Sequence, residues 1–163
     1  MAGPRYASNA VERQQGFLEA MAETAGAEPL VAEGDFSAKS GADAVHCWMA
    51  HRPHPTAVIA INDSVALGVL EAFGDHDVRV PADIALAGFD GVALAASRIF
   101  DLTTVDQHID QLGQRAVRVL LRRLGGPADA GPTRQVLRTR LLLRGSTEGP
   151  RRAAMDRSAA QAR

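Results

Sequence analysis

The chain lacks several features that would define its class at once. It contains one cysteine, Cys47, so it cannot form an internal disulfide, which fits a reducing compartment. Its 18 basic and 19 acidic side chains give a net charge of −1, without the positive excess that nucleic acid or an anionic membrane surface attracts. No apolar run approaches the length of a transmembrane helix, and the first ten residues, MAGPRYASNA, have no apolar core like that of a secretory signal. These absences predict a soluble, intracellular protein with no membrane partner.

Motifs for catalysis and metal binding are also absent. The sequence has no G-x-G-x-x-G, P-loop or G-x-S-x-G motif, which leaves nucleotide-dependent and serine-hydrolase chemistry without support. The prolines of HRPHP indicate a surface turn, and no cysteine or carboxylate is placed near it to complete a metal site. The five histidines concerned are His46, His51, His54, His76 and His108. We therefore predict no metal, no cofactor and no enzyme activity.

The stretch from Thr56 to Phe73 organises the rest of the chain. Its first part, Ala57 to Ile61, is a short apolar run that predicts a strand covered on both faces. Apolar residues then recur with the period of an amphipathic helix, starting at Ala66. Asn62 and Asp63 lie at the junction, where short polar side chains cap a helix or contact a ligand at the carboxyl end of a strand. A strand that runs directly into a helix is half of a βαβ unit.

Strands and helices alternate over the first 90 residues. We predict helices over residues 9–25 and 37–50, with Ser8 or Asn9 as the first N-cap, and strands at 30–32 and 84–87. This order predicts an α/β fold with a parallel sheet flanked by helices. The chain opens on a loop at Gly3 and Pro4 and enters a helix with no strand before it. Because such a helix normally follows a strand, we expect the leading strand to be missing and the chain to be a fragment.

The pattern changes after Asp90. Residues 92–96 predict one helical turn, 102–105 an extended segment, 107–124 a helix and 135–143 a strand. The alanine-rich, polar residues 148–163 predict a disordered tail.

An ordered set of short motifs resembles the effector-binding core of LacI-type transcriptional regulators. The motifs are Arg13-Gln14-Gln15-Gly16-Phe17, Gly34-Asp35-Phe36-Ser37, Ala60-Ile61-Asn62-Asp63, Arg79-Val80-Pro81-Ala82-Asp83-Ile84, Gly88-Phe89-Asp90, Leu102-Thr103-Thr104-Val105 and Arg144-Gly145-Ser146-Thr147. No single motif is specific, but the ordered set is, and it covers roughly nine-tenths of the chain, leaving only the tail.

The resemblance implies a partial periplasmic-binding-protein-like fold. Residues 1–100 would be most of the C-terminal effector-binding subdomain without its first strand, and residues 101–106 a crossover hinge. Residues 107–147 would be the last helix and strand of the N-terminal subdomain. The intact protein would be a cytoplasmic homodimer that binds operator DNA only through a helix-turn-helix headpiece, which this chain lacks.

The resemblance also implies a ligand site. Arg13 resembles the effector-contacting arginine, whose planar guanidinium offers five donors to ligand oxygens. Asp90 resembles an aspartate that accepts hydrogen bonds from sugar hydroxyls, and Asn62 can both donate and accept. Phe36 resembles an aromatic residue that packs on the ligand ring. Asn9 matches a position near the pocket rim.

Each of these residues also has a purely structural interpretation. Arg13 could be a solvated helix residue, Phe36 a core residue, Asn62 a helix cap, and Asp90 a cap of the next turn. Asp63 could be either a helix cap or a ligand contact.

A dimer contact is implied near the end of the first subdomain. Arg98, Ile99 and Phe100 resemble part of the family's subunit interface, although they could simply cover the sheet edge.

Two functions remain open at this point. The first is a regulator core that senses a sugar or related small metabolite. The alternative is a periplasmic sugar-binding protein of a transporter, which shares the two-lobed fold. Residues 79–84 and 102–105 favour the regulator, and an enzyme is a distant third possibility because no nucleophile and base can be named.

Overall fold

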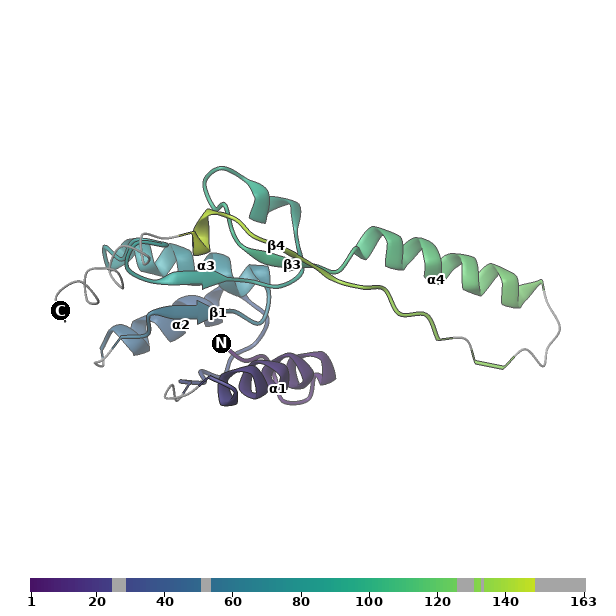
Figure 1. The fold of residues 1–163 in the computed structure, drawn as a ribbon, viewed down its shortest axis with the longest axis horizontal. Helices are drawn as coiled ribbons and strands as arrows, with labels where there is room; N and C mark the ends of the chain where they lie inside the picture. The colour runs from purple at the N-terminus through teal and green to yellow at the C-terminus, as the bar shows by residue number, and fades with distance from the viewer. Residues whose placement is uncertain (25–28, 51–53, 126–130, 133, 149–163) are drawn as a thin grey trace, which may run out of the picture.

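A computed structural model describes residues 1–24, 29–50, 54–125, 131–132 and 134–148 (Figure 1). The elements, in chain order, are α1 (Ser8–Ala22), α2 (Ala38–Met49), β1 (Ala57–Ile59), α3 (Asp63–Asp75), β2 (Ala85–Ala87), the 3-10 turn η1 (Ala93–Ala96), β3 (Thr104–Asp106), α4 (Ile109–Leu124), β4 (Arg140–Leu142) and the 3-10 turn η2 (Gly145–Thr147).

The sheet is parallel at its centre. β1 pairs with β2 in parallel, with Val58 opposite Leu86. Parallel bridges then join Ala87 to Thr103 and Asp90 to Asp106, so the segment that ends in β3 extends the sheet beyond β2. β4 returns antiparallel to β3. The predicted α/β fold with a parallel sheet is confirmed.

Helices α2 and α3 pack tightly against each other, and α3 contacts β2. The core between them includes Val45, Val65, Val69 and Phe73, none of which has solvent-exposed area. Gly41 of α2 and Gly68 of α3 permit the close crossing of the two helices. A Cβ on Gly68 would lie inside the contact distance of the Ala38 carbonyl oxygen, which belongs to the other helix.

Three local predictions are wrong. The strand at β1 is not covered on both faces, because Ile59 keeps 51% of its area exposed while Val58 is buried. Residues 30–32 are not assigned as a strand. Helix α1 begins at Ser8, so the residue in the N-cap position is Ala7, which offers no side-chain hydrogen bond. The first two errors share a cause, since both segments border an unfilled space in the sheet.

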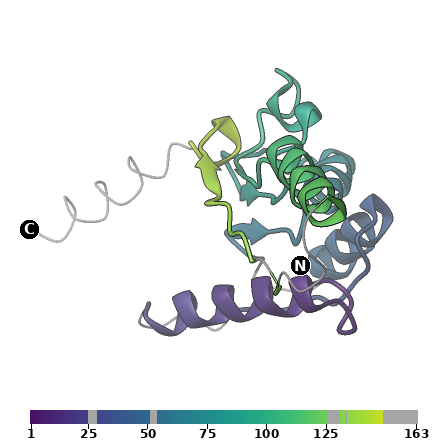
Figure 2. The same cartoon turned by 90° about the vertical axis from the view of Figure 1, so that its right-hand side faces the viewer.

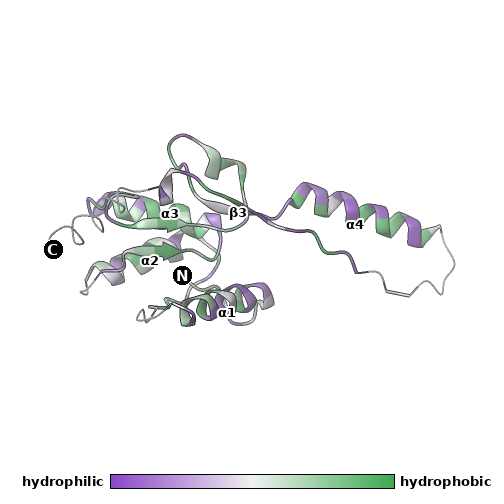
Figure 3. Cartoon of the chain, viewed as in Figure 1, coloured by the Kyte–Doolittle hydropathy of each residue, from purple (hydrophilic) through white to green (hydrophobic). Residues whose placement is uncertain are grey.

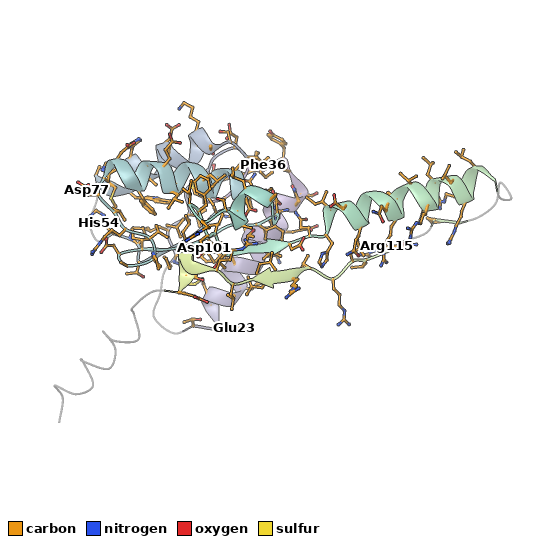
Figure 4. All side chains as sticks on the ribbon, turned by 90° about the horizontal axis from the view of Figure 1, so that it is seen from above. Glu23, Phe36, His54, Asp77, Asp101 and Arg115 are labelled. Carbon is orange, nitrogen blue, oxygen red and sulfur yellow. The ribbon has the colours of Figure 1, made fainter. Side chains whose placement is uncertain are left out.

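Helix α4 and residues 134–139 project away from the body in Figure 1, and Figure 2 shows α4 nearly end-on. α4 is strongly amphipathic, with an apolar stripe visible in Figure 3, yet none of its residues is buried. Arg115, labelled in Figure 4, lies on this arm far from Phe36. The helix predicted over residues 107–124 is confirmed, whereas most of the predicted tail, residues 149–163, lies outside the described residues.

Two glycines of α3 give opposite stability predictions. We expect Gly68→Ala to lower the free energy of unfolding by about 1–3 kcal/mol, because the new methyl group would push α2 and α3 apart. Gly74→Ala, in the same helix, meets nothing within 4 Å. It should raise the free energy of unfolding by about 0.5–1 kcal/mol, since alanine loses less backbone entropy. Urea unfolding of both variants tests the crossing, and equal effects would contradict it.

Candidate functional site

The candidate site lies at the carboxyl ends of β1 and β2. The chain leaves β1 through Ile61 and Asn62, and it leaves β2 through Phe89 and Asp90. Parallel strands end on the same edge of a sheet, and this edge is where open α/β folds bind ligands. Helix α1 passes over the edge and contributes Arg13.

Arg13 touches both strand ends. Its Nη1 donates to the Ile61 carbonyl oxygen at 2.7 Å, and its Nη2 lies 3.4 Å from Oδ1 of Asp90. The guanidinium carbon stacks 3.9 Å from the centre of the Phe89 ring, a cation–π arrangement. The Arg13 side chain retains only 17% of its exposure. These contacts exclude the interpretation of Arg13 as a solvated helix residue.

Asp90 is held in an unusual conformation. Its backbone φ of 127° lies in a region that non-glycine residues rarely adopt, and such strain is concentrated at functional sites. Nε2 of Gln107 donates to Oδ1 of Asp90 at 2.6 Å. Burial raises the pKa of the Asp90 carboxyl above its ordinary value, the positive charge of Arg13 opposes this, and the charge of Asp63 adds to it. The carboxylate is therefore incompletely compensated and suited to accept further hydrogen bonds.

Asn62 is a helix cap in this structure. Its Oδ1 accepts from the Val65 backbone N–H at 2.8 Å, and its Nδ2 donates to the Phe36 carbonyl oxygen at 3.1 Å. One amide hydrogen and one lone pair remain for a ligand by the ordinary capacity of the group. Phe36 is half-buried and packs against the core. The ligand roles of Asn62 and Phe36 stay predictions.

The remaining predicted residues lie apart from this cluster. Asn9 is exposed in the first turn of α1. Arg98 and Ile99 lie beyond η1, where Ile99 keeps 84% of its area exposed, and Phe100 packs partly against the core. Their rim and subunit-contact roles also stay predictions.

The sequence left Asp63 open, and the structure makes it the centre of the site's support. The side chain is fully buried. Its Oδ1 accepts from the Thr104 hydroxyl at 2.5 Å and its Oδ2 from the Val92 N–H at 2.9 Å, while its own N–H donates to the Phe89 carbonyl oxygen at 2.7 Å. Sequence reasoning also missed Gln107, because nothing in the local pattern indicates its contact with Asp90.

Two features are absent from the described residues. No group of three or more histidines, cysteines, aspartates or glutamates there is arranged to hold a metal ion. In the same part of the chain, no helix has the length and apolarity needed to cross a membrane.

A family model described as a periplasmic binding protein-like domain matches residues 1–147. The chain therefore belongs to this family.

The similar curated proteins are repressors. The HTH-type transcriptional repressor PurR of Photobacterium profundum is 33% identical over 126 residues, which are 76% of this chain and 38% of the relative. The ribose operon repressor of Escherichia coli is 39% identical over 94 residues, which are 58% of this chain and 28% of the relative. The chain thus spans less than half the length of these relatives.

Solved structures give the same grouping. A LacI transcriptional regulator from Rhodococcus species superposes with a TM-score of 0.82 at 32% identity, covering 92% of this chain and 55% of the other. The transcriptional regulator CelR–cellobiose complex superposes with a TM-score of 0.80 at 33% identity, covering 90% of this chain and 45% of the other. The lac repressor dimer bound to operator and the anti-inducer ONPF superposes with a TM-score of 0.80 at 32% identity, covering 90% of this chain and 44% of the other. The resemblance to the effector-binding core of LacI-type regulators is confirmed.

The raised pKa of Asp90 predicts how replacing this residue changes the free energy of unfolding at two pH values. Because its folded-state pKa is raised, its favourable contribution to stability is complete below the ordinary aspartate pKa and is lost as pH rises through the raised value. Asp90→Asn should therefore gain stability relative to the parent protein at pH 7, and gain less at pH 3. Urea unfolding at the two pH values measures the difference.

Asp83→Asn is the matched control with the opposite sign. Hydrogen bonds from Arg79 lower the pKa of Asp83 to about 2, so its contribution to stability is present at neutral pH and lost on acidification. Asp83→Asn should lose stability at pH 7, with a smaller loss at pH 3. A pH-independent effect of Asp90→Asn would show that its charge carries no cost in the fold.

Proposed function

We propose that this chain is the ligand-sensing core of a LacI-type transcriptional regulator, and that a sugar or related small metabolite binds at the shared edge of β1 and β2. The observation that carries the proposal is the meeting of Arg13 with Asp90, 3.4 Å apart on different elements at that edge. The guanidinium of Arg13 offers hydrogen-bond donors beside the acceptor oxygens of Asp90. This pair matches a hydroxyl group, which both donates and accepts.

The ligand class follows from the chemistry of the site. Arg13 and Asp90 would bind hydroxyl oxygens, Asn62 would add an amide contact, and Phe36 would pack on the apolar face of a ring, with Asn9 near the rim. The names of similar proteins refer to cellobiose and to a ribose operon, which supports a sugar-like effector here.

The contact from Gln107 offers a route for sensing. Gln107 follows β3, in the segment that leads away from the body into α4, and its amide donates to the carboxylate of Asp90. A ligand that occupies Asp90 would compete with or reinforce this bond. It would thereby favour one arrangement of the crossover over another through its differential affinity for the two.

The proposal also covers the partners of the intact protein and the boundaries of its subdomains. We infer a cytoplasmic homodimer, with Arg98, Ile99 and Phe100 at the subunit contact, that addresses operator DNA through a headpiece outside this chain. The boundaries at residues 100, 106 and 147 are likewise proposals. The repressor names of the relatives favour this account over a transporter's periplasmic binding protein, and they give no support to catalysis.

Calorimetry on the full-length protein with ribose and cellobiose tests the proposal. We expect Arg13→Ala and Asp90→Ala each to weaken binding of the active sugar by about 10- to 100-fold, the cost of one hydrogen bond to a charged group.

Arg5→Ala is the control for removing an arginine. Arg5 bonds to Glu33 on the surface, and its side chain is 84% exposed. This variant should bind as tightly as the parent protein. If all three variants bound the sugar equally, the site would lie elsewhere.

A further inference from the structure

Two histidines from different helices meet on the surface where α2 and α3 end. His46 lies in the last turn of α2, and His76 follows the last residue of α3. Nδ1 of His46 and Nε2 of His76 are 3.0 Å apart, and the centroids of the two rings are 5.2 Å apart. Both side chains are exposed, so dissolved ions can reach them. We call these two residues the histidine pair.

The backbone beneath the histidine pair is fixed by the core. Helices α2 and α3 pack closely against each other (Figure 1). Val45, which precedes His46, and Phe73, three positions before His76, have no solvent-exposed area. The N–H of His76 donates to the Phe73 carbonyl oxygen at 3.2 Å. The helix crossing itself therefore brings the two imidazole rings together.

The separation of the two nitrogens suits two kinds of contact. In a hydrogen bond, one neutral ring donates its N–H to the lone pair of the other ring. As metal ligands, two nitrogens about 2.1 Å from one ion and at a right angle would lie about 3.0 Å apart, whereas a tetrahedral angle would place them about 3.4 Å apart. The 3.0 Å separation therefore fits adjacent positions of a square-planar or octahedral ion.

Both rings can offer a lone pair at these two atoms without losing a proton. The ring that donates the hydrogen bond would carry its hydrogen on its other nitrogen, which is the second neutral tautomer of imidazole. Either ring nitrogen can act as a metal ligand. Binding would thus exchange one hydrogen bond for two coordinate bonds, and water would fill the remaining positions around the ion.

The charges around the histidine pair favour a positive ion. His46 and His76 lie at the carboxyl ends of two helices, where unpaired carbonyl groups create a partial negative charge. Asp75 and Asp77 flank His76 in the sequence, and both are exposed. A cation at this position would therefore be attracted by two helix ends and by neighbouring carboxylates.

We propose that the histidine pair binds a divalent transition-metal ion of the Cu²⁺ or Ni²⁺ kind, which links the ends of α2 and α3. These ions bind imidazole well and favour square-planar or tetragonal geometry. Mg²⁺ prefers oxygen ligands and should not bind here. With two protein ligands, the site is smaller than the groups of three or more that are absent from the described residues.

The histidine pair is remote from the candidate site. Helix α3 begins at Asp63, beside that site, and its 13 residues rise by about 1.5 Å each, or about 20 Å in all. An ion at the far end of α3 would therefore occupy a second site, separate from a ligand at Arg13 and Asp90. No metal site was predicted from the sequence, because 30 positions separate the two histidines.

Titration of the 163-residue chain with CuCl₂, NiCl₂ and MgCl₂ tests the proposal. The emission of Trp48, the only tryptophan, reports bound Cu²⁺ because this residue lies two positions from His46. Calorimetry gives the affinity and stoichiometry of Ni²⁺, and proton NMR of the imidazole rings shows which histidines lie near the paramagnetic ion.

The variants are His46→Gln, His76→Gln and the combination of the two. The matched control is His108→Asn, because His108 also has a neighbouring ligand type, the Asp106 carboxylate, whose Oδ2 is 3.0 Å from its Nδ1. This control separates the histidine pair from binding to any exposed histidine.

One Ni²⁺ ion per chain should bind and broaden the ring signals of His46 and His76 first, and Cu²⁺ should quench Trp48. Each single variant should weaken Ni²⁺ binding by about tenfold or more, because the second contact of a chelated ion is intramolecular. The double variant should bind no more weakly than the singles. His108→Asn should bind like the parent protein, and MgCl₂ should have no effect.

The proposal is overturned if either single variant binds Ni²⁺ as tightly as the parent protein. Two equal losses that add in the double variant would also contradict it, since they would indicate histidines that bind independently.

Discussion

The buried carboxylate of Asp63 holds together the segments on which the candidate site depends. A carboxylate without solvent contact is costly unless donors surround it, and here the donors come from different parts of the chain. The Thr104 hydroxyl belongs to β3 and the Val92 N–H to the turn after β2, while Asp63 itself occupies the first turn of α3. An acidic group at a helix N-terminus is further favoured by the helix dipole. Removing either donor would leave a buried charge undersatisfied, so these three segments are constrained to one arrangement.

That arrangement explains why the neighbouring groups are free to act on a ligand. Asp63 satisfies the structural requirements of the junction together with Asn62, which caps α3 through Val65. Asp90, at the end of the adjacent strand, is left with a long contact to Arg13 and a single short hydrogen bond from Gln107. Its carboxyl is therefore the less compensated of the two, as its raised pKa reflects. The two carboxylates differ in their hydrogen-bond donors. Asp63 accepts from Thr104 and Val92, whereas Asp90 accepts a short bond from Gln107.

Local pattern was sufficient to predict the helices and the parallel strands, whereas the candidacy of Arg13 and Asp90 came from the resemblance to the family. Periodicity marks α2 and α3, and an apolar run followed by polar residues marks the end of β1. Local pattern was insufficient where distant partners decide the outcome. Ile59 was predicted to be buried because its neighbours are apolar, but it borders a hollow and keeps 51% of its area exposed. The role of Asp63 depends on Thr104, 41 positions along the chain, and Gln107 reaches Asp90 across 17 positions. No motif encodes either pairing.

The central claim is that polar groups at neighbouring strand ends converge on one small-molecule site. The most direct measurement is a crystal structure of the full-length protein with its bound sugar. The account predicts ligand oxygens at about 3 Å from both the Arg13 guanidinium and the Asp90 carboxylate, with the 3.4 Å contact between those two groups altered by the ligand. A sugar bound elsewhere, with Arg13 and Asp90 still facing each other as they do here, would contradict it.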